Sequence, residues 1–388
     1  MDVFVNLEAQ AGATYHDQLR IALIAERNGI GGVFRADHVR GFGALQPPGP
    51  SDAWTVLAGL ARDTTTVRLG TLMTCAPLRL PAMLAMTTAG VDRMSGGRLE
   101  LGIGAGWFES EHRSAGARLN SPAERLQQLH EYLEIVTGLW RCPPGETFTH
   151  HGRFYHVEDN PGLPKPAQTP RPPIIVGGNG RRQTPALAAR FADEYNLPRA
   201  TPARAQAHVT RAQQACQAAG RDPATLRISV TLQLCCGSSV MQADARARRY
   251  GWDGDQDTVT GTPGDLLQHL AVYADAGISR VYAHITDFRD EEHIALLGAA
   301  VAVPAIGLGN GQPVPIASTV EGPAFAVRSA GRLQPGDLIR LPWSPRTFVR
   351  VTTTPKRTAT ARVRTEATND LGELYVLDLD DWHPLHLD

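Results

Sequence analysis

Cysteine is scarce in this sequence, and the few cysteines show no spacing typical of a metal site or a disulfide framework. The five cysteines lie at positions 75, 142, 216, 235 and 236. Their number is odd, and neither a zinc-ligand spacing nor a redox pair occurs among them. We therefore expect reduced thiols and a cytoplasmic protein.

An excess of charge of either sign is also lacking. The chain has 38 basic and 39 acidic residues, and its C-terminal part, residues 323–388, has nine basic and eight acidic residues. Binding to nucleic acid or to a membrane surface usually requires a basic excess or a basic patch. We therefore expect neither partner.

Long apolar runs are missing as well. The longest, residues 294–309, is interrupted by Pro304 and is shorter than the roughly 20 residues that span a bilayer. The first residues, Met1 to Val5, lack the positive charge and apolar core of a signal peptide. We interpret residues 294–309 as a buried helix that continues into a linker.

What the sequence does contain is a regular alternation of short β-rich runs and helical runs. The predicted strands are 3–7, 32–35, 67–71, 99–103, 174–176, 195–197, 228–234 and 280–285. Helical runs follow them, for example 15–28, 52–62 and 81–94. Eight such units within about 300 residues predict a (β/α)8 TIM barrel, a fold whose active sites lie in the loops after the strands.

Two segments depart from this rhythm. Residues 147–157 are typical of a hairpin insertion, and a proline-rich run at 161–173 returns the chain to the barrel. We place the barrel at residues 1–300, a linker at 301–322 and a small antiparallel β module of unknown role at 323–388. Such a small module has little core of its own.

Glycines crowd the end of the fourth predicted strand, at Gly102, Gly104 and Gly106. One interpretation is tight packing where the chain leaves the sheet. A dinucleotide-binding fingerprint fits poorly, because its third glycine would fall at Trp107 and we expect no strong helix directly afterwards.

Asp37 and His38 follow the second predicted strand, where barrel loops face the site. His38 is a candidate proton carrier near neutral pH, and Asp37 is a candidate to orient it. The alternative is that Asp37 caps a loop and His38 is a packed polar residue.

A glycine loop, Gly177-Gly178-Asn179-Gly180, follows the fifth strand and precedes Arg181 and Arg182. Its backbone N–H groups, with the next helix capped by Thr184, would form an anion cradle. An ordinary left-handed turn is the alternative.

Other polar residues have simpler interpretations. We expect Arg79 to be solvated and Glu109 and Glu111 to be structural, because two acids so closely spaced on one loop do not fit a glycosidase. The pair His150-His151 lies in the predicted hairpin, away from the strand ends, so we expect no metal site.

Several ordered segments make residues 1–300 resemble the bacterial luciferase-like superfamily of flavin and deazaflavin oxidoreductases. The matching segments are 36–38, 51–61, 67–71, 94–107, 152–155, 170–178 and 261–263. The C-terminal module is not part of that pattern.

The resemblance implies a planar flavin or deazaflavin in the barrel mouth. The ring would rest on a bulge at Leu72, Met73 and Thr74, with a non-proline cis bond at Leu72-Met73, and the phosphate would reach residues 177–180. By the same resemblance His38 lies beside the ring. Ala105, Gly106 and Trp107 would line the cofactor, and Arg40, Phe42 and Trp107 would line the substrate pocket.

One branch of deazaflavin enzymes has a glutamate where this chain has Trp107, so the sugar-phosphate chemistry of that branch does not transfer. The resemblance therefore implies hydride transfer between coenzyme F420 and a small organic substrate. The alternative within the superfamily is an FMN-dependent monooxygenase supplied with reduced flavin by a separate reductase. From other classes, an inactive barrel that acts as a binding or assembly partner and a hydrolase stay open. Relatives often form homodimers.

Overall fold

The computed structural model describes residues 1–42, 48–255 and 257–308, together with the backbone of short strands between residues 328 and 385. The chain divides into two compact units, Met1–Val314 and Pro315–Asp388. No helix among the described residues is long and apolar enough to cross a membrane.

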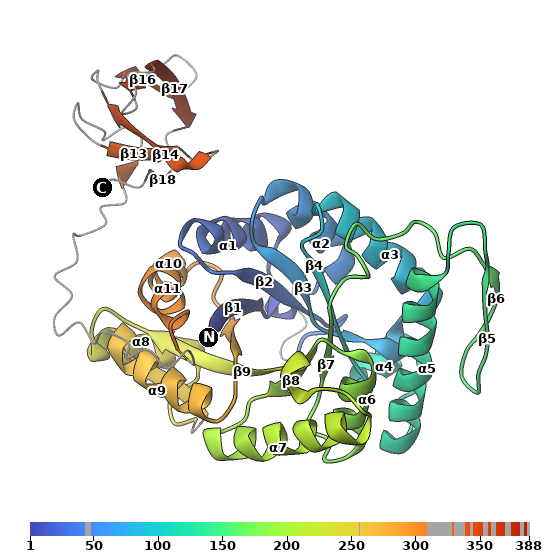
Figure 1. The fold of residues 1–388 in the computed structure, drawn as a ribbon. Coiled ribbons are helices and arrows are strands. Elements are labelled where there is room, and N and C mark those ends of the chain that lie inside the picture. Colours follow the sequence, from blue (N-terminus) through green and yellow to red (C-terminus); the bar gives the residue numbers. More distant parts are fainter. Residues whose placement is uncertain are drawn as a thin grey trace. The chain divides into compact units, whose positions relative to one another are not determined.

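The first unit is a closed barrel of eight parallel strands (Figure 1). The barrel strands are β1 (Asp2–Leu7), β2 (Gly32–Asp37), β3 (Arg68–Cys75), β4 (Leu99–Gly104), β7 (Ile174–Gly177), β8 (Glu194–Pro198), β9 (Arg227–Cys236) and β11 (Arg280–Ile285). Pairing of β1 with β11 and of β8 with β9 closes the ring. The predicted (β/α)8 TIM barrel is confirmed.

Strand β9 is longer than the others and has a further neighbour that the sequence did not predict. Residues 229–232 pair with β11, whereas residues 233–236 pair with the short strand β10 (Thr258–Gly261). The C-terminal part of β9, residues 233–236, therefore leaves the barrel wall near the loops that follow the strands.

Helices cover the outside of the barrel (Figure 1). They are α1 (Tyr15–Arg27), α2 (Ala53–Asp63), α3 (Pro81–Met94), α4 (Glu109–Ser114), α5 (Pro122–Arg141), α6 (Gln183–Phe191), α7 (Pro202–Ala218), α8 (Val240–Tyr250), α9 (Pro263–Asp275), α10 (Glu291–Leu297) and α11 (Val303–Ala305). Local sequence explains several starts. Ser121 and Glu124 form the expected capping box of α5, with Pro122 at its first position.

Three details differ from the sequence predictions. Helix α4 begins two residues after Trp107, where we expected no strong helix. Helix α6 begins at Gln183 with Arg182 as its N-cap and no side-chain cap, so Thr184 does not cap it. Residues 301–305, assigned to a linker, are helical and extend α10 through a π-helical turn at Gly298–Ala302.

Large side chains fill the barrel interior. Phe4, Phe34, Leu72, Ile175 and Tyr282 form one buried cluster, with Met73 packed against it. The Phe34 and Tyr282 rings lie 5.0 Å apart, edge to face. The barrel is therefore a packed core and not a pore, so a ligand site has to lie at one of its ends.

An ion network closes the amino-terminal end of the barrel. Arg280 Nη1 donates to Glu100 Oε2 at 2.7 Å and to Glu194 Oε2 at 2.8 Å. The Tyr282 hydroxyl donates to Glu194 Oε1 at 2.8 Å. All four residues are buried. This arrangement leaves the carboxyl ends of the strands as the place for a site.

The remaining elements are not part of the barrel. The hairpin of β5 (Phe148–His151) and β6 (His156–Asn160) is antiparallel and lies beside α5 (Figure 1). In the second unit, β13 (Leu338–Leu341), β14 (Ser344–Val351), β16 (Arg362–Thr368) and β17 (Leu374–Asp380) form an antiparallel sheet with β15 (Lys356–Arg357). The short strands β12 (Arg328–Ser329) and β18 (Pro384–Leu385) pair with each other. The sequence analysis assigned no role to this β module.

Candidate active site

His38 lies directly after β2 and is held by a carboxylate from another loop. Its Nδ1 is 3.0 Å from Glu111 Oε1, and the Val39 backbone N–H donates to the same oxygen at 2.9 Å. Glu111 is only 2 % exposed, whereas His38 is half-buried. Helix α4, which the sequence did not predict, brings Glu111 to this position.

Asp37 does not orient His38, contrary to the sequence interpretation. Its carboxylate accepts two hydrogen bonds from Arg79, at 2.9 and 2.8 Å, and one from the Thr74 hydroxyl at 2.9 Å. Arg79 also donates to Asp52 at 2.7 Å, so it is not simply solvated. Burial lowers the pKa of Arg79, but its hydrogen bonds to the two aspartates and their charges outweigh burial and raise it. This buried network fixes the loop that carries His38.

A second carboxylate–imidazole pair, which the sequence analysis missed, lies at the ends of β1 and β11. Glu8 Oε1 is 2.8 Å from His284 Nδ1 and accepts a 2.7 Å hydrogen bond from the Asn6 amide. Gln10 donates to the other Glu8 oxygen. Burial raises the pKa of Glu8, but hydrogen bonds from His284 and Gln10 and the charge of His284 outweigh it and lower that pKa.

The position of Glu8, directly after a predicted strand, was the available signal for this pair. Asn6 Oδ1 and Gln10 Oε1 are buried acceptors without a hydrogen-bond partner among the described residues. At the β1–β11 side of the barrel mouth, these two oxygens can therefore each accept a further hydrogen bond.

The bulge in β3 has the predicted backbone. The Leu72–Met73 peptide bond is cis, and the pairing of β3 with both neighbouring strands shifts register there. Leu72 faces the interior cluster. Met73 reaches β7, because a Cβ on Gly177 would lie 2.7 Å from Met73 Cε. The structure thus brings together the β3 bulge and the glycine loop after β7, both of which we assigned to the cofactor. The Thr74 side chain, in contrast, is buried against Asp37.

The loop after β4 is tightly packed at Gly106. Its φ of +75° favours glycine, and a Cβ would lie 2.7 Å from Cys75 Sγ. Arg125 donates to the Gly106 carbonyl and so ties the loop to α5. Gly106 thus sets the direction in which Ala105 and Trp107 leave the strand.

Aromatic side chains gather beside His38. Phe42 and Trp107 stack with ring centroids 5.7 Å apart, and Trp107 stacks on Phe108 at 5.3 Å. The His38 ring meets Phe42 edge to face at 4.8 Å. Arg40 lies on the same loop and is half-buried. The predicted pocket residues Phe42 and Trp107 are therefore neighbours of the predicted proton carrier.

The glycine loop after β7 has the properties of an anion site. The N–H groups of Asn179 and Gly180 donate to no protein acceptor within the described ranges. A side chain on Gly180 would collide with Thr184 Oγ1, so only glycine lets the backbone lie against the start of α6. Because α6 has no side-chain cap, its first N–H groups also stay available to an anion.

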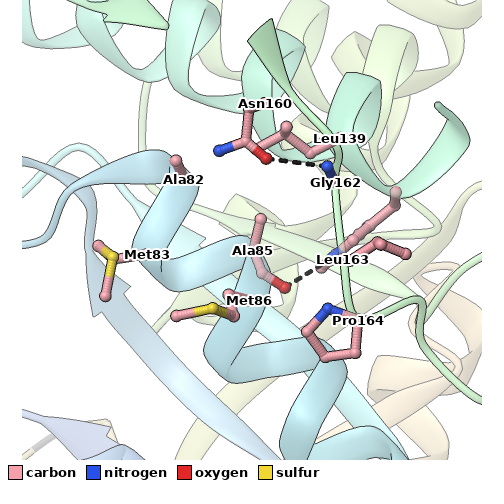
Figure 2. A pocket seen from close by; sticks show the side chains of 10 residues that line it. Ala82, Met83, Ala85, Met86, Leu139, Asn160, Gly162, Leu163 and Pro164 are labelled. Carbon is pink, nitrogen blue, oxygen red and sulfur yellow. Dashed lines mark hydrogen bonds between the residues drawn. The ribbon is translucent and has the colours of Figure 1, made fainter. Parts of the chain in front are cut away.

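Two hollows of the surface lie elsewhere. A groove of about 70 Å³ runs between α3 and the segment before β7 (Figure 2). Its lining residues are Ala82, Met83, Ala85, Met86, Leu139, Trp140, Asn160, Gly162, Leu163 and Pro164. A polar hollow of about 180 Å³ lies beside α8 and β10. Neither contains the side chains with acid–base chemistry described above, so we place the candidate site by the strand ends.

Two other chemistries find no support in the described part of the chain. No three His, Cys, Asp or Glu side chains within it gather closely enough to hold a metal ion. Cys75 lies 3.6 Å from His112 Nε2, but burial raises the pKa of its thiol to about 12. Cys75 is therefore not a ready nucleophile.

Comparison with known proteins places this barrel in a family. The luciferase-like monooxygenase family matches residues 2–293. An FMNH2-dependent dimethylsulfone monooxygenase of Pseudomonas putida is 29% identical over 176 residues, which are 45% of this chain and 47% of that protein. The oxygenase component of a flavin-dependent trigonelline monooxygenase of Acinetobacter baylyi is 32% identical over 164 residues, 42% of either chain. This chain thus spans less than half the length of these two relatives.

Solved structures show the same fold at low identity. An F420-dependent secondary alcohol dehydrogenase with an F420–acetone adduct has a TM-score of 0.67 and 18% identity, covering 79% of this chain and 99% of that one. A monooxygenase of Streptomyces bottropensis has a TM-score of 0.64 and 22% identity, covering 77% and 98%. Because the family model matches residues 2–293, three quarters of the sequence, this chain belongs to the luciferase-like monooxygenase family.

Proposed function

We propose that the protein is an oxidoreductase that transfers a hydride between coenzyme F420 and a small organic substrate. The observation that carries this proposal is the His38–Glu111 pair, at 3.0 Å, in the barrel mouth. Reduction of a carbonyl or oxidation of an alcohol needs a proton at the substrate oxygen as well as a hydride. A histidine held by a buried carboxylate suits that task.

The residues present fit a planar cofactor with an anionic tail. The Leu72–Met73 bulge and the loop of Ala105 and Gly106 would hold the ring, and residues 177–180 would hold the phosphate. The unpaired backbone N–H groups and the uncapped start of α6 support the phosphate assignment. When bound, the cofactor supplies the hydride or accepts it.

The protein's own part in the reaction is proton handling and positioning. With Nδ1–H donating to Glu111, the other ring nitrogen of His38, Nε2, is the atom that holds or releases a proton. The hydrogen bond to Glu111 fixes this tautomer and the orientation of the ring. Arg79 and Asp37 act as positioning residues, because they fix the loop on which His38 lies.

A second candidate is an FMN-dependent monooxygenase that receives reduced flavin from a separate reductase. The two flavin-dependent relatives of Pseudomonas putida and Acinetobacter baylyi favour it. The same cradle and the same His38 would serve, since FMN also has a planar ring and a phosphate.

Titration of the purified chain with each cofactor, followed by tryptophan fluorescence, separates the candidates. We expect micromolar binding of F420 and weaker binding of FMN. His38→Asn should lower the rate of F420-dependent turnover by about 10²- to 10⁴-fold and leave cofactor affinity unchanged, whereas exposed His16→Asn should change neither. Binding of FMN alone would reverse the order. If neither cofactor binds, the alternative of a binding or assembly partner without catalysis replaces both.

We also propose a homodimer, formed over the surface of α3. Leu80 and Met83 are 65% and 53% exposed, and Met86 lies one turn further along the same helix, beside the groove in Figure 2. Exposed apolar patches of this kind often mark protein interfaces. Light scattering during gel filtration should show a dimer, and Met83→Lys should convert it to a monomer. A monomeric wild type would contradict the proposal.

A further inference from the structure

Three aromatic side chains form an exposed surface at the barrel mouth. We call Phe42, Trp107 and Phe108 the aromatic wall. Phe42 and Trp107 remain 54% and 64% exposed although they stack on each other, and Phe108 closes the group at 5.2 Å from Phe42. Solvent contact of so much aromatic surface is unfavourable, so an apolar ligand gains free energy by covering it.

The wall lies next to the proton carrier of the proposed reaction. The His38 ring meets Phe42 at 4.8 Å and Trp107 at 6.3 Å, both edge to face. A molecule lying on the wall is therefore within the immediate surroundings of His38.

Two arginines bound to the segments that carry His38 and Trp107 are engaged in the protein itself. Arg79 is bound by Asp37 and Asp52, and Arg125 donates to the carbonyl of Gly106, the residue before Trp107. Neither guanidinium is available to a phosphate group of a substrate. The wall itself offers ring surface, and these two arginines add no anion site to it.

We propose that the substrate carries a planar aromatic ring, which stacks on the wall beside His38. This inference rests on the proposed function for the reaction, and on the wall alone for the substrate class. Aromatic rings gain from offset stacking and edge contacts beyond the burial of area, which a saturated ring of the same size does not. A saturated substrate would cover the wall but would lack that gain.

The test compares 2-naphthol with decahydro-2-naphthol, which have the same hydroxyl group on flat and saturated rings. Binding to the full chain is measured by calorimetry, with and without F420 or FMN. We expect 2-naphthol to bind about three- to tenfold more tightly than the saturated alcohol. Trp107→Leu and Phe42→Leu should each remove most of this preference. Phe154→Leu, in the hairpin segment, is the matched control and should leave it unchanged.

Equal or tighter binding of the saturated alcohol would overturn the proposal, because simple hydrophobicity would then explain the wall. A preference for 2-naphthol that survives both leucine substitutions would also overturn it. The titrations with cofactor are read separately, so absence of cofactor binding would count against the proposed reaction and not against the aromatic wall.

Discussion

The two ends of the barrel both contain buried carboxylates paired with cationic or imidazole side chains, but they differ in how far the paired cation or imidazole is exposed to solvent. At the amino-terminal end, Arg280 joins Glu100 and Glu194 among fully buried neighbours, and its guanidinium lies 4.1 Å from the centre of the Phe4 ring. At the carboxyl-terminal end, His38 and His284 are half-buried and stay accessible beside their carboxylates.

The carboxylates of the two ends also differ in pKa. Burial raises the pKa of Glu194, and the charge of Arg280 only partly opposes it. The pKa of Glu8 is instead lowered, because hydrogen bonds from His284 and Gln10 and the charge of His284 outweigh burial. A closed network stabilises the fold, whereas an open pair with accessible nitrogen atoms can exchange protons with a ligand. We therefore call the amino-terminal end the structural end, and the carboxyl-terminal end, where we propose the reaction, the reactive end.

The largest expected effect comes from breaking the structural end. Arg280→Leu leaves Glu100 and Glu194 buried without their cation, and we expect a loss of about 3–5 kcal/mol in the free energy of unfolding. Urea denaturation measures this loss. The exposed Arg190–Glu134 pair is the control, since Arg190→Leu should cost less than about 1 kcal/mol. Equal effects of the two substitutions would contradict a structural role for the closed network.

A substitution at the reactive end should affect turnover more than stability. Glu111→Gln keeps an acceptor for the Val39 N–H but removes the charge that faces His38. A charge-assisted hydrogen bond contributes about 1.5–3 kcal/mol, so we expect kcat to fall about 10- to 100-fold at unchanged cofactor affinity. Glu109→Gln, on the exposed side of the same helix, should leave kcat unchanged. If the two variants behave alike, Glu111 has no part in the reaction.

A third cluster of buried polar groups, around His293 on the outside of the barrel near the end of β9, should make the free energy of unfolding depend on pH. His293 accepts a hydrogen bond from the Cys236 N–H at 3.2 Å, and burial, with the charge of Arg246, lowers the pKa of His293 to about 3. Between the ordinary value of about 6.5 and this value, only the unfolded chain binds the proton. The contribution of His293 to the free energy of unfolding is therefore complete above about pH 6.5. It falls by about 1.4 kcal/mol per pH unit as the pH is lowered toward the folded-state pKa of about 3.

His293→Gln removes this proton uptake and keeps an acceptor. Its free energy of unfolding should therefore fall less steeply than that of the wild type between about pH 6 and pH 4, and exposed His16→Gln should follow the wild type. Parallel curves for wild type and His293→Gln would mean that the buried imidazole does not control acid stability. A clear difference between the two curves would show that the buried cluster around His293 stabilises the fold near the reactive end.

The smallest effect belongs to a residue outside these clusters. Thr262 caps α9 and forms a capping box with Asp265. Thr262→Ala should cost about 1 kcal/mol of stability without changing turnover. Thr210→Ala, inside α7, is the control and should cost less. A change in turnover would mean that the loop before α9 contributes to the site.

Local patterns predicted most of the barrel but little of the hydrogen bonding in its mouth. The alternation of short apolar runs with helical runs placed all eight strands, and the capping box at Ser121 placed the start of α5. The start of α6 was wrong, because Thr184 is buried beneath the glycine loop, and local propensity does not report burial. Helix α4 was missed because it is short, with six residues that are all polar and therefore show no apolar periodicity.

The partners of the reactive side chains depended on contacts across long stretches of chain. His38 meets Glu111 across 73 residues, and Asp37 meets Arg79 across 42, whereas the sequence suggested that neighbouring Asp37 would orient His38. The aromatic wall similarly joins Phe42 from one loop to Trp107 from another.

The sequence by itself determined the barrel, the glycine loops and the position of His38 at a strand end, because these depend on periodicity and backbone freedom over a few residues. Only the tertiary structure decided which carboxylate holds His38, that Glu8 and His284 form a second pair, and that the ends of the barrel differ. Closure of the barrel brings the ends of all eight strands together, and a local pattern has no information about which side chains then meet.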